Sequence, residues 1–191
     1  MKLAPSLFGL LLVIVLIHAG GCASSQPKLT QEQILEEYPK VAELDTAMNK
    51  ARTNGADLRA PESYSNAREA LELAMDAARD DKKEAANKAA TEGLKVVDKV
   101  FRNTATSNKI LFEVLRTRER VIDAGVNNLQ GEKLAELDEK LKETAILIEN
   151  DKLGKAKQRR PKLIQGYTAL ELATLKKGTA DMAKSAIAKA E

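Results

Sequence analysis

The chain has 191 residues, and its 31 Lys and Arg against 28 Asp and Glu give a formal net charge of +3. This near balance argues against a nucleic-acid binder, in which basic residues would be more numerous and more concentrated. The one histidine and the one cysteine are His18 and Cys22. We therefore expect no zinc site, no cofactor, no disulfide within the chain, and no enzyme that depends on histidine or a free thiol.

Residues 1–21 have the pattern of a secretion signal peptide. Lys2 gives a positive start, and an unbroken apolar run covers residues 7–17. The alternative is a membrane-spanning helix. A helix over residues 3–19 would be only about 25 Å long, however, which is shorter than a hydrocarbon core of about 30 Å. Cleavage of this segment would also remove His18.

Three small residues, Ala19, Gly20 and Gly21, precede Cys22. This order resembles the lipobox of bacterial lipoproteins, in which the leader is cleaved before the cysteine and acyl chains such as palmitate are added. The resemblance implies signal cleavage after Gly21 and a covalent lipid on Cys22 that anchors the protein to a membrane. Two or more acyl chains give stable membrane anchoring. In that family an aspartate directly after the cysteine tends to retain the protein in the inner membrane, and this chain has Ala23 there, so the resemblance implies the periplasmic side of the bacterial outer membrane.

The mature chain begins with a polar tether over residues 22–29. Apolar residues then recur at steps of three and four, which predicts a first helix from Thr30 to about Gly55. Pro39 removes an amide donor, so we expect a kink or a fresh start there.

A second helix begins at Pro61 and stops at the charged turn over residues 79–82. A long third helix follows. Residues 102–108 are poor helix formers, which leaves a kink or a turn open, but the absence of Pro and Gly favours a continuous helix. We assign residues 30–130 to an N-terminal helical bundle.

A turn over residues 127–131 leads into a strongly amphipathic fourth helix, and a corner at Asn150 leads into the last helix. We assign residues 131–191 to a C-terminal helical hairpin. No segment alternates apolar and polar residues as a strand would. The predicted fold is therefore all-α: an elongated antiparallel bundle of about five helices.

Two corners look alike, with Ala74 and Ala85 flanking the first and Ala145 and Ala156 flanking the second. This small-residue spacing is similar to that of tetratricopeptide hairpins, although the aromatic and proline positions of that motif are absent. Either the chain contains a true repeat, or two unrelated hairpins both need small residues where their helices cross.

Residues 51–99 carry a further likeness, quoted as Ala51–Ala56, Ala60–Tyr64, Ala67, Ala70, Leu71, Ala74, Ala85 and Ala89. The segment resembles an uncharacterised Ala-rich helical domain of bacterial envelope lipoproteins, which often precedes an OmpA-like peptidoglycan-binding module. The resemblance implies a helical envelope protein. The Ala- and Lys-rich sequence that follows is unlike an OmpA module, so cell-wall binding by that route is not implied.

One basic cluster surrounds Pro161 and consists of Lys155, Lys157, Arg159, Arg160 and Lys162. Several lysines close to a charged surface attract anionic lipid or acidic cell-wall polymer by about 1 kcal/mol each. The alternative is a solvated helix face.

Acidic pairs such as Asp80 and Asp81 lie in Lys-rich helical sequence without a nearby aromatic or Gly-rich stretch, so we expect no catalytic role for them.

These features predict a membrane-anchored helical lipoprotein with a structural or assembly role, which acts by binding another envelope protein. The alternative is a periplasmic carrier or chaperone-like binder of lipid or unfolded outer-membrane protein, with the Ala-rich seams as a loosely packed lining. The sequence leaves the partner and the oligomeric state open.

Overall fold

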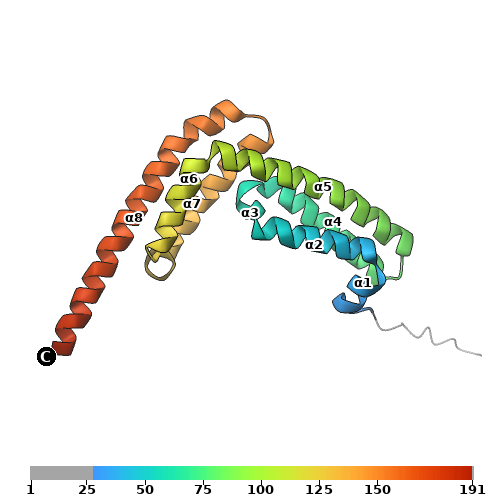
Figure 1. Ribbon diagram of the computed structural model, residues 1–191, viewed down its shortest axis with the longest axis horizontal. Coiled ribbons are helices and arrows are strands. Elements are labelled where there is room, and N and C mark those ends of the chain that lie inside the picture. Colours follow the sequence, from blue (N-terminus) through green and yellow to red (C-terminus); the bar gives the residue numbers. More distant parts are fainter. Residues whose placement is uncertain (1–27, 191) are drawn as a thin grey trace, which may run out of the picture.

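The computed structural model describes residues 28–190, and every regular element in this part of the chain is an α-helix (Figure 1). The helices are α1 (Gln31–Glu37), α2 (Pro39–Thr53), α3 (Ala56–Arg59), α4 (Pro61–Arg79), α5 (Lys83–Ile110), α6 (Phe112–Asp123), α7 (Val126–Glu149) and α8 (Leu153–Ala190). The all-α prediction is confirmed. The described residues form eight helices rather than about five, because two predicted helices are each interrupted once and the short helix α3 was not predicted.

The first interruption is at Pro39. Thr30 starts α1 with a capping box, in which its hydroxyl accepts from the Gln33 amide (3.3 Å) and its own amide donates to the Gln33 side chain (2.9 Å). Tyr38 then leaves helical geometry (φ −118°, ψ 80°), and Pro39 becomes the first residue of α2. The proline thus gives a fresh start rather than a kink.

A second interruption lies at Leu111. Helix α5 is continuous through residues 102–108, as predicted, and ends at Ile110. Leu111 has φ −103° and ψ 14°, yet its amide still donates to the Ser107 carbonyl (2.8 Å) and its side chain is fully buried. The chain therefore changes direction at Leu111 while its amide stays hydrogen-bonded and its side chain stays buried. Helix α6 thus runs in a different direction from α5.

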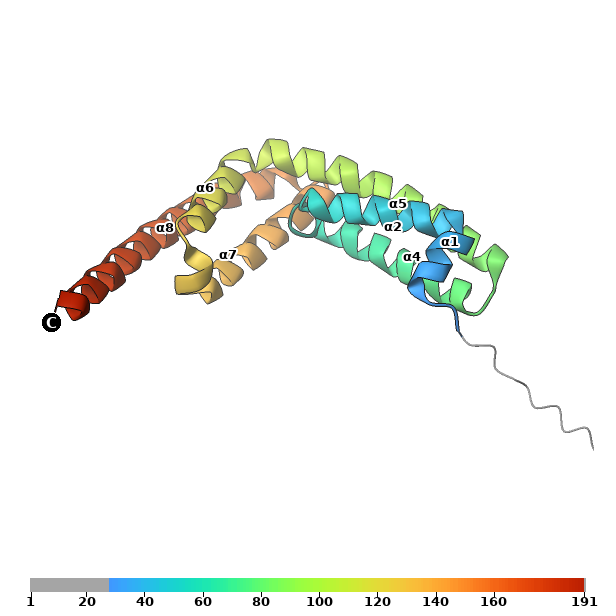
Figure 2. The ribbon, with the colours of Figure 1, turned by 60° about the horizontal axis from the view of Figure 1, so that its bottom comes forward.

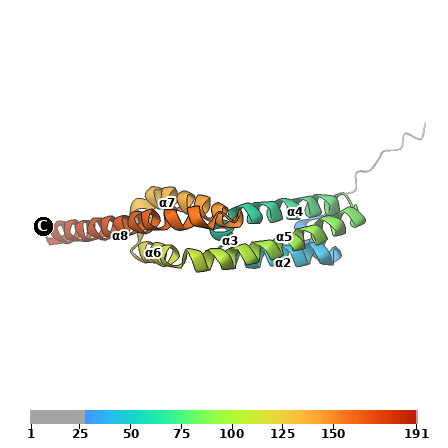
Figure 3. The same cartoon turned by 90° about the horizontal axis from the view of Figure 1, so that it is seen from above.

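The helices form two three-helix groups arranged end to end (Figures 1 to 3). Helices α2, α4 and α5 pack side by side in the first group, and α6, α7 and α8 pack in the second. The chain passes directly from α5 into α6, so one long, bent element runs through both groups. The short helix α3 contacts both α5 and α7 and lies where the groups meet.

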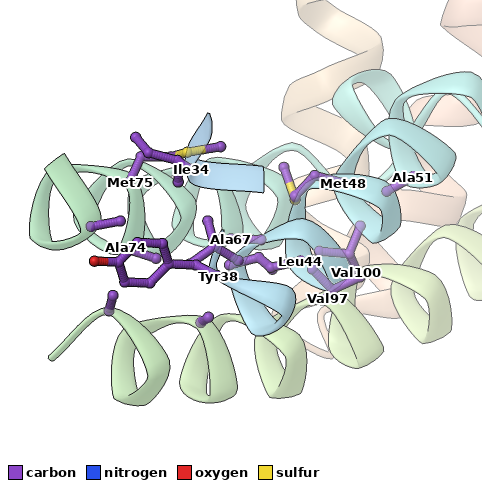
Figure 4. Packing of buried hydrophobic residues seen from close by; sticks show 14 of the residues in the cluster. Ile34, Tyr38, Leu44, Met48, Ala51, Ala67, Ala74, Met75, Val97 and Val100 are labelled. Carbon is purple, nitrogen blue, oxygen red and sulfur yellow. The ribbon is translucent and has the colours of Figure 1, made fainter. Parts of the chain in front are cut away.

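Each group has its own hydrophobic core. The first core contains Ile34, Tyr38, Leu44 and Val100 together with many alanines (Figure 4). The second begins at Leu111 and includes Leu141, Leu163, Tyr167 and Leu170. The cores thus divide close to residue 111, before the boundary at residue 130 that the sequence suggested.

The two groups repeat the same backbone at positions 70 residues apart. Gly55 (φ 66°) and Gly125 (φ 84°) both have positive φ, and so do Asp81 (φ 53°) and Asp151 (φ 56°). The amide of each aspartate donates to the carbonyl three residues earlier, at 3.0 and 3.1 Å. Ala60 (φ −146°, ψ 55°) likewise corresponds to Gln130 (φ −150°, ψ 40°).

We therefore call residues 41–110 unit 1 and residues 111–180 unit 2. The corners noted in the sequence are equivalent, but the register pairs Met75, not Ala74, with Ala145. Each unit spans three principal helices, unlike a two-helix tetratricopeptide repeat. The predicted turn over residues 127–131 is part of α7, which departs from helical geometry only at Gln130.

Candidate functional site

The residues predicted for signal cleavage and lipid attachment, Ala19, Gly20, Gly21 and Cys22, lie outside the described residues. The chain enters the described part beside α1, at the end of the molecule opposite to the C-terminal end of α8 (Figure 1). Among residues 28–190, no helix is both long enough and apolar enough to cross a bilayer.

The five basic residues predicted to contact an anionic surface all lie in the first part of α8, and the structure divides them between two sides of that helix. Lys155, Arg159 and Lys162 follow one another at helical spacing and line one hollow beside Leu147 of α7. Lys157 and Arg160 line a different hollow. The sequence cluster is therefore not one patch.

Of the three basic residues on the first side, Arg159 is paired with an acidic residue. The Arg159 guanidinium donates to the Glu143 carboxylate of α7 at 3.0 Å. Lys162 and Arg159 also border a hollow of about 420 Å³ between α7 and α8, whose lining includes Lys140, Glu143, Leu137 and Leu163. This hollow combines leucine side chains with three cationic groups and one carboxylate, and the excess of cations suits an amphipathic anion.

The two units are joined by a polar network at the end of α7. The Glu149 carboxylate accepts from the backbone amides of Glu62 (3.0 Å) and Ser63 (2.8 Å) at the start of α4, and from the Ser63 hydroxyl. The Asn103 side chain of α5 donates to Ser63 Oγ (2.8 Å), and Asn150 donates to the Glu62 carboxylate (2.9 Å). One carboxylate thus caps the N-terminus of α4 and fixes α7 against it.

This network was not identified from the sequence. Ser63 and Asn103 are 86 and 46 residues from Glu149, and each looks like an ordinary surface residue of its helix. The pairing becomes recognisable only from the packing of α7 against α4 and α5.

A second network lies inside unit 2. The Arg118 guanidinium of α6 donates twice to the Asp138 carboxylate of α7, both at 2.7 Å, and the Tyr167 hydroxyl of α8 donates to the same carboxylate at 2.8 Å. The hydrogen bond to Asp138 raises the pKa of Arg118, whereas burial is the main cause of a raised pKa for Tyr167. This network ties all three helices of unit 2 together.

The C-terminal half of α8 presents an exposed apolar stripe. Leu172, Leu175, Met182 and Ile187 are 51 to 68% exposed. Leu170 is buried against the core, and Leu172 lies two residues further on, on the opposite side of the helix. The stripe therefore faces away from the core.

Within residues 28–190, no three Asp, Glu, His or Cys side chains are placed to hold a metal ion. The acidic pair Asp80 and Asp81 is exposed at the corner between α4 and α5, where Asp81 accepts from the Tyr38 hydroxyl (2.8 Å) and Asp80 pairs with Lys82. Its contacts are those of a structural corner.

Comparison of the chain with protein-family models, curated proteins and solved structures finds no match. The resemblance of residues 51–99 to a helical domain of envelope lipoproteins therefore stays a prediction.

Proposed function

We propose that this protein is a membrane-anchored lipoprotein of the bacterial outer membrane with a structural or assembly role, and that it acts by binding another envelope protein. The observation that carries the proposal is its shape: two units follow one another end to end, and the N-terminal and C-terminal ends of the described chain lie far apart (Figure 1). Such a rod separates an anchored end from binding faces further along.

The Ala-rich seam supports a structural role over a carrier role. Ala67, Ala74, Ala86 and Ala90 are fully buried where α4 meets α5. A Cβ atom added at Gly93 would lie 2.6 Å from Leu44 Cδ2. The seam is thus closely packed, and it offers no loose lining for an apolar ligand.

A lipid-binding function remains the second candidate because of the hollow between α7 and α8. Its leucine side chains and the cationic groups of Lys140, Arg159 and Lys162 suit an acyl chain with an anionic head group. Native mass spectrometry of the purified protein would test this. Retained lipid that is lost in a Leu137→Glu variant would favour the carrier, whereas protein free of lipid would favour the structural role.

The anchor is tested by growing cells with labelled palmitate and separating inner and outer membranes. We expect label on the wild-type protein in the outer membrane, and neither label nor membrane association in a Cys22→Ala variant. A wild-type product with an unmodified thiol in the soluble fraction would contradict the proposal.

The basic residues of α8 provide a further test of surface contact. We expect acyl-free protein to bind anionic vesicles weakly through Lys155, Arg159 and Lys162, which share one side of the helix. Reversing the two charges of Lys155 and Lys162 would weaken co-sedimentation more than the matched reversal of Lys157 and Arg160. Equal sedimentation of both variants and the wild type would eliminate this contact.

A further inference from the structure

A pocket of about 510 Å³ lies at the start of α7, in unit 2. It is lined by residues 128–133 of α7 and by Ala173 and Lys177 of α8. Seventy residues earlier, the corresponding positions are 58–63, Asn103 and Ser107. These positions lie around the junction at which unit 1 holds the end of α7. The pocket is therefore the unit 2 counterpart of the junction between the units.

The two places share their backbone. Ala60 and Gln130 have nearly the same φ and ψ, and a helical segment starts at the next residue in each case. The amides of Glu132 and Lys133 thus correspond to those of Glu62 and Ser63, which donate to Glu149. In unit 1 this arrangement holds a carboxylate, whereas among residues 28–190 nothing takes the corresponding place in unit 2.

The surroundings of the pocket are more positively charged than those of the junction. Lys133 replaces Ser63 and Lys177 replaces Ser107, so two ammonium groups stand where unit 1 has hydroxyls. Both lysines are exposed and are held at the pocket by hydrogen bonds, from Lys133 to the Gln130 side chain (2.9 Å) and from Lys177 to the Leu129 carbonyl (3.1 Å). The pocket favours an anionic occupant more strongly than the junction does.

We propose that this pocket, which we call the α7 socket, binds the C-terminal end of an acidic helix from a partner protein. A Glu or Asp side chain of that helix would take the place that Glu149 has in unit 1, accepting from the amides of Glu132 and Lys133 and facing the ammonium groups of Lys133 and Lys177. The inference rests on the proposed protein-binding function and identifies a surface and a partner chemistry for it.

The corresponding helix ends of a folded second copy are not available to the socket, since Glu149 at the end of α7 is held at its own junction. The corner of unit 1 that corresponds to the end of α7 carries Arg79 at the position of Glu149, and Arg79 would meet Lys133 and Lys177. Its Asp81 is already bound by the Tyr38 hydroxyl at 2.8 Å. Repulsion between like charges and the lack of a free carboxylate at this corner therefore favour a different protein as the partner.

The socket is tested with a synthetic peptide that has the sequence of residues 140–150, is amidated at its C-terminus and is constrained to be helical. The protein without its leader is labelled with ¹⁵N and titrated with this peptide. We expect chemical-shift changes centred on the amides of Glu132 and Lys133, with affinity about tenfold lower for Lys133→Glu. Lys95→Glu, an exposed reversal in unit 1, is the matched control and should bind as the wild type does.

Several outcomes of the titration would overturn the proposal. They are equal binding by a peptide with Gln in place of the residue corresponding to Glu149, shifts at Glu62 and Ser63 instead of the socket, or no shifts at all. Circular dichroism checks that the Lys133→Glu variant is folded. If it is not, Lys177→Glu provides a second variant.

A photo-crosslinking residue at Asn128 extends the test to cells, with one at Lys95 as control. The proposal would be supported by an adduct from position 128 whose attached peptide is the end of a helix that terminates at Glu or Asp. This adduct should be lost when Lys133→Glu and Lys177→Glu are combined. No adduct, or an adduct with a second copy of this chain, would overturn the proposal. The proposed anchor is judged separately, since the socket variants leave palmitate labelling and membrane fractionation unchanged.

Discussion

Units 1 and 2 have the same backbone turns but fill their interiors differently. In unit 1, the seam between α4 and α5 is made of alanines, whereas unit 2 has larger side chains at most of the same positions. The pairs are Ala67 and Leu137, Ala74 and Thr144, Ala78 and Ile148, Ala86 and Ala156, and Ala90 and Arg160. The repeated backbone thus depends on a few positions with special conformations, and the volume between its helices is free to vary.

The difference extends to polarity. Arg118 of unit 2 stands where unit 1 has the buried Met48, and Asp138 stands where unit 1 has the exposed Arg68. Unit 2 therefore fixes its three helices with a charged network, and unit 1 does so by close apolar packing. Substitutions at paired positions should have very different effects in the two units.

Among exchanges of residues between the units, the largest effect is expected from giving unit 1 a side chain that unit 2 has. Gly93 corresponds to Leu163, and even a Cβ atom at Gly93 would lie 3.1 Å from Ala70 Cβ and closer still to Leu44. Gly93→Leu should lower the free energy of unfolding by about 2–3 kcal/mol, because overpacking outweighs the gain in helix propensity. Chemical denaturation measures the loss.

Gly154→Leu is the control for this substitution, since a Cβ atom at Gly154 has nothing within 4 Å. Its stability should stay within about 0.5 kcal/mol of the wild type. If Gly93→Leu were equally harmless, the alanine seam of unit 1 would be looser than the structure indicates.

The next effect sharpens the difference in polarity. Asp138→Ala would leave Arg118 and the Tyr167 hydroxyl without their acceptor, where the side chains of Arg118 and Asp138 are only 23% and 17% exposed. We expect a loss of about 2 kcal/mol, less than for a fully buried pair. The matched change Arg68→Ala, at a 62% exposed side chain, should cost under about 0.5 kcal/mol. Equal losses in thermal or urea unfolding would contradict the comparison.

The same comparison explains what could be predicted from the sequence. Helical periodicity, the capping box at Thr30 and the fresh start at Pro39 are local signals, so the helical fold was predictable. The likeness of the two corners left a repeat open, but its register and extent were not predictable, because only nine of the 70 aligned pairs are identical, among them Gly55 with Gly125 and Asp81 with Asp151. Its determinants are backbone conformations rather than side-chain patterns.

The candidate sites could not be predicted from the sequence either, because they depend on which residues the folded chain brings together. The basic residues of α8 are adjacent in the sequence, yet the 3.6-residue turn of the helix sends them to two sides. The socket and the junction are the reverse case, since their residues are distant in the sequence and meet only because α7 packs against α8 at the socket and against α4 and α5 at the junction.

A smaller effect is expected at the junction. Glu149→Ala would leave the amides of Glu62 and Ser63 without their carboxylate, at a cost of about 1–2 kcal/mol. Those two amides should also exchange faster with solvent. Arg79→Ala, at the equivalent position of unit 1, removes only an exposed pair with Asp76 and should change little. Unchanged exchange at Ser63 in Glu149→Ala would show that the carboxylate does not hold the units together.

The raised pKa of Tyr167 gives a pH dependence that comes from unit 2 and that Tyr167→Phe removes. A phenol whose pKa is higher in the folded state stabilises the protein fully below its unfolded pKa of about 10, and this contribution is lost as the pH rises further. The wild type should therefore lose more stability than Tyr167→Phe between about pH 9 and pH 11.5. Parallel curves for the two proteins would argue against the burial of this hydroxyl.

The smallest effect is a gain, obtained by giving unit 2 a residue of unit 1. Gly131 corresponds to Pro61, the first residue of α4, and Gln130 already has the φ and ψ that Ala60 has before Pro61. Gly131→Pro should therefore raise the free energy of unfolding by about 0.4–1 kcal/mol, because proline restricts the unfolded chain at a position where the folded chain fits it. Gly166→Pro, in the interior of α8, is the opposite control and should lose about 3 kcal/mol or more. A loss at position 131 would mean that the start of α7 does not repeat the start of α4, and it would remove the basis for comparing the socket with the junction.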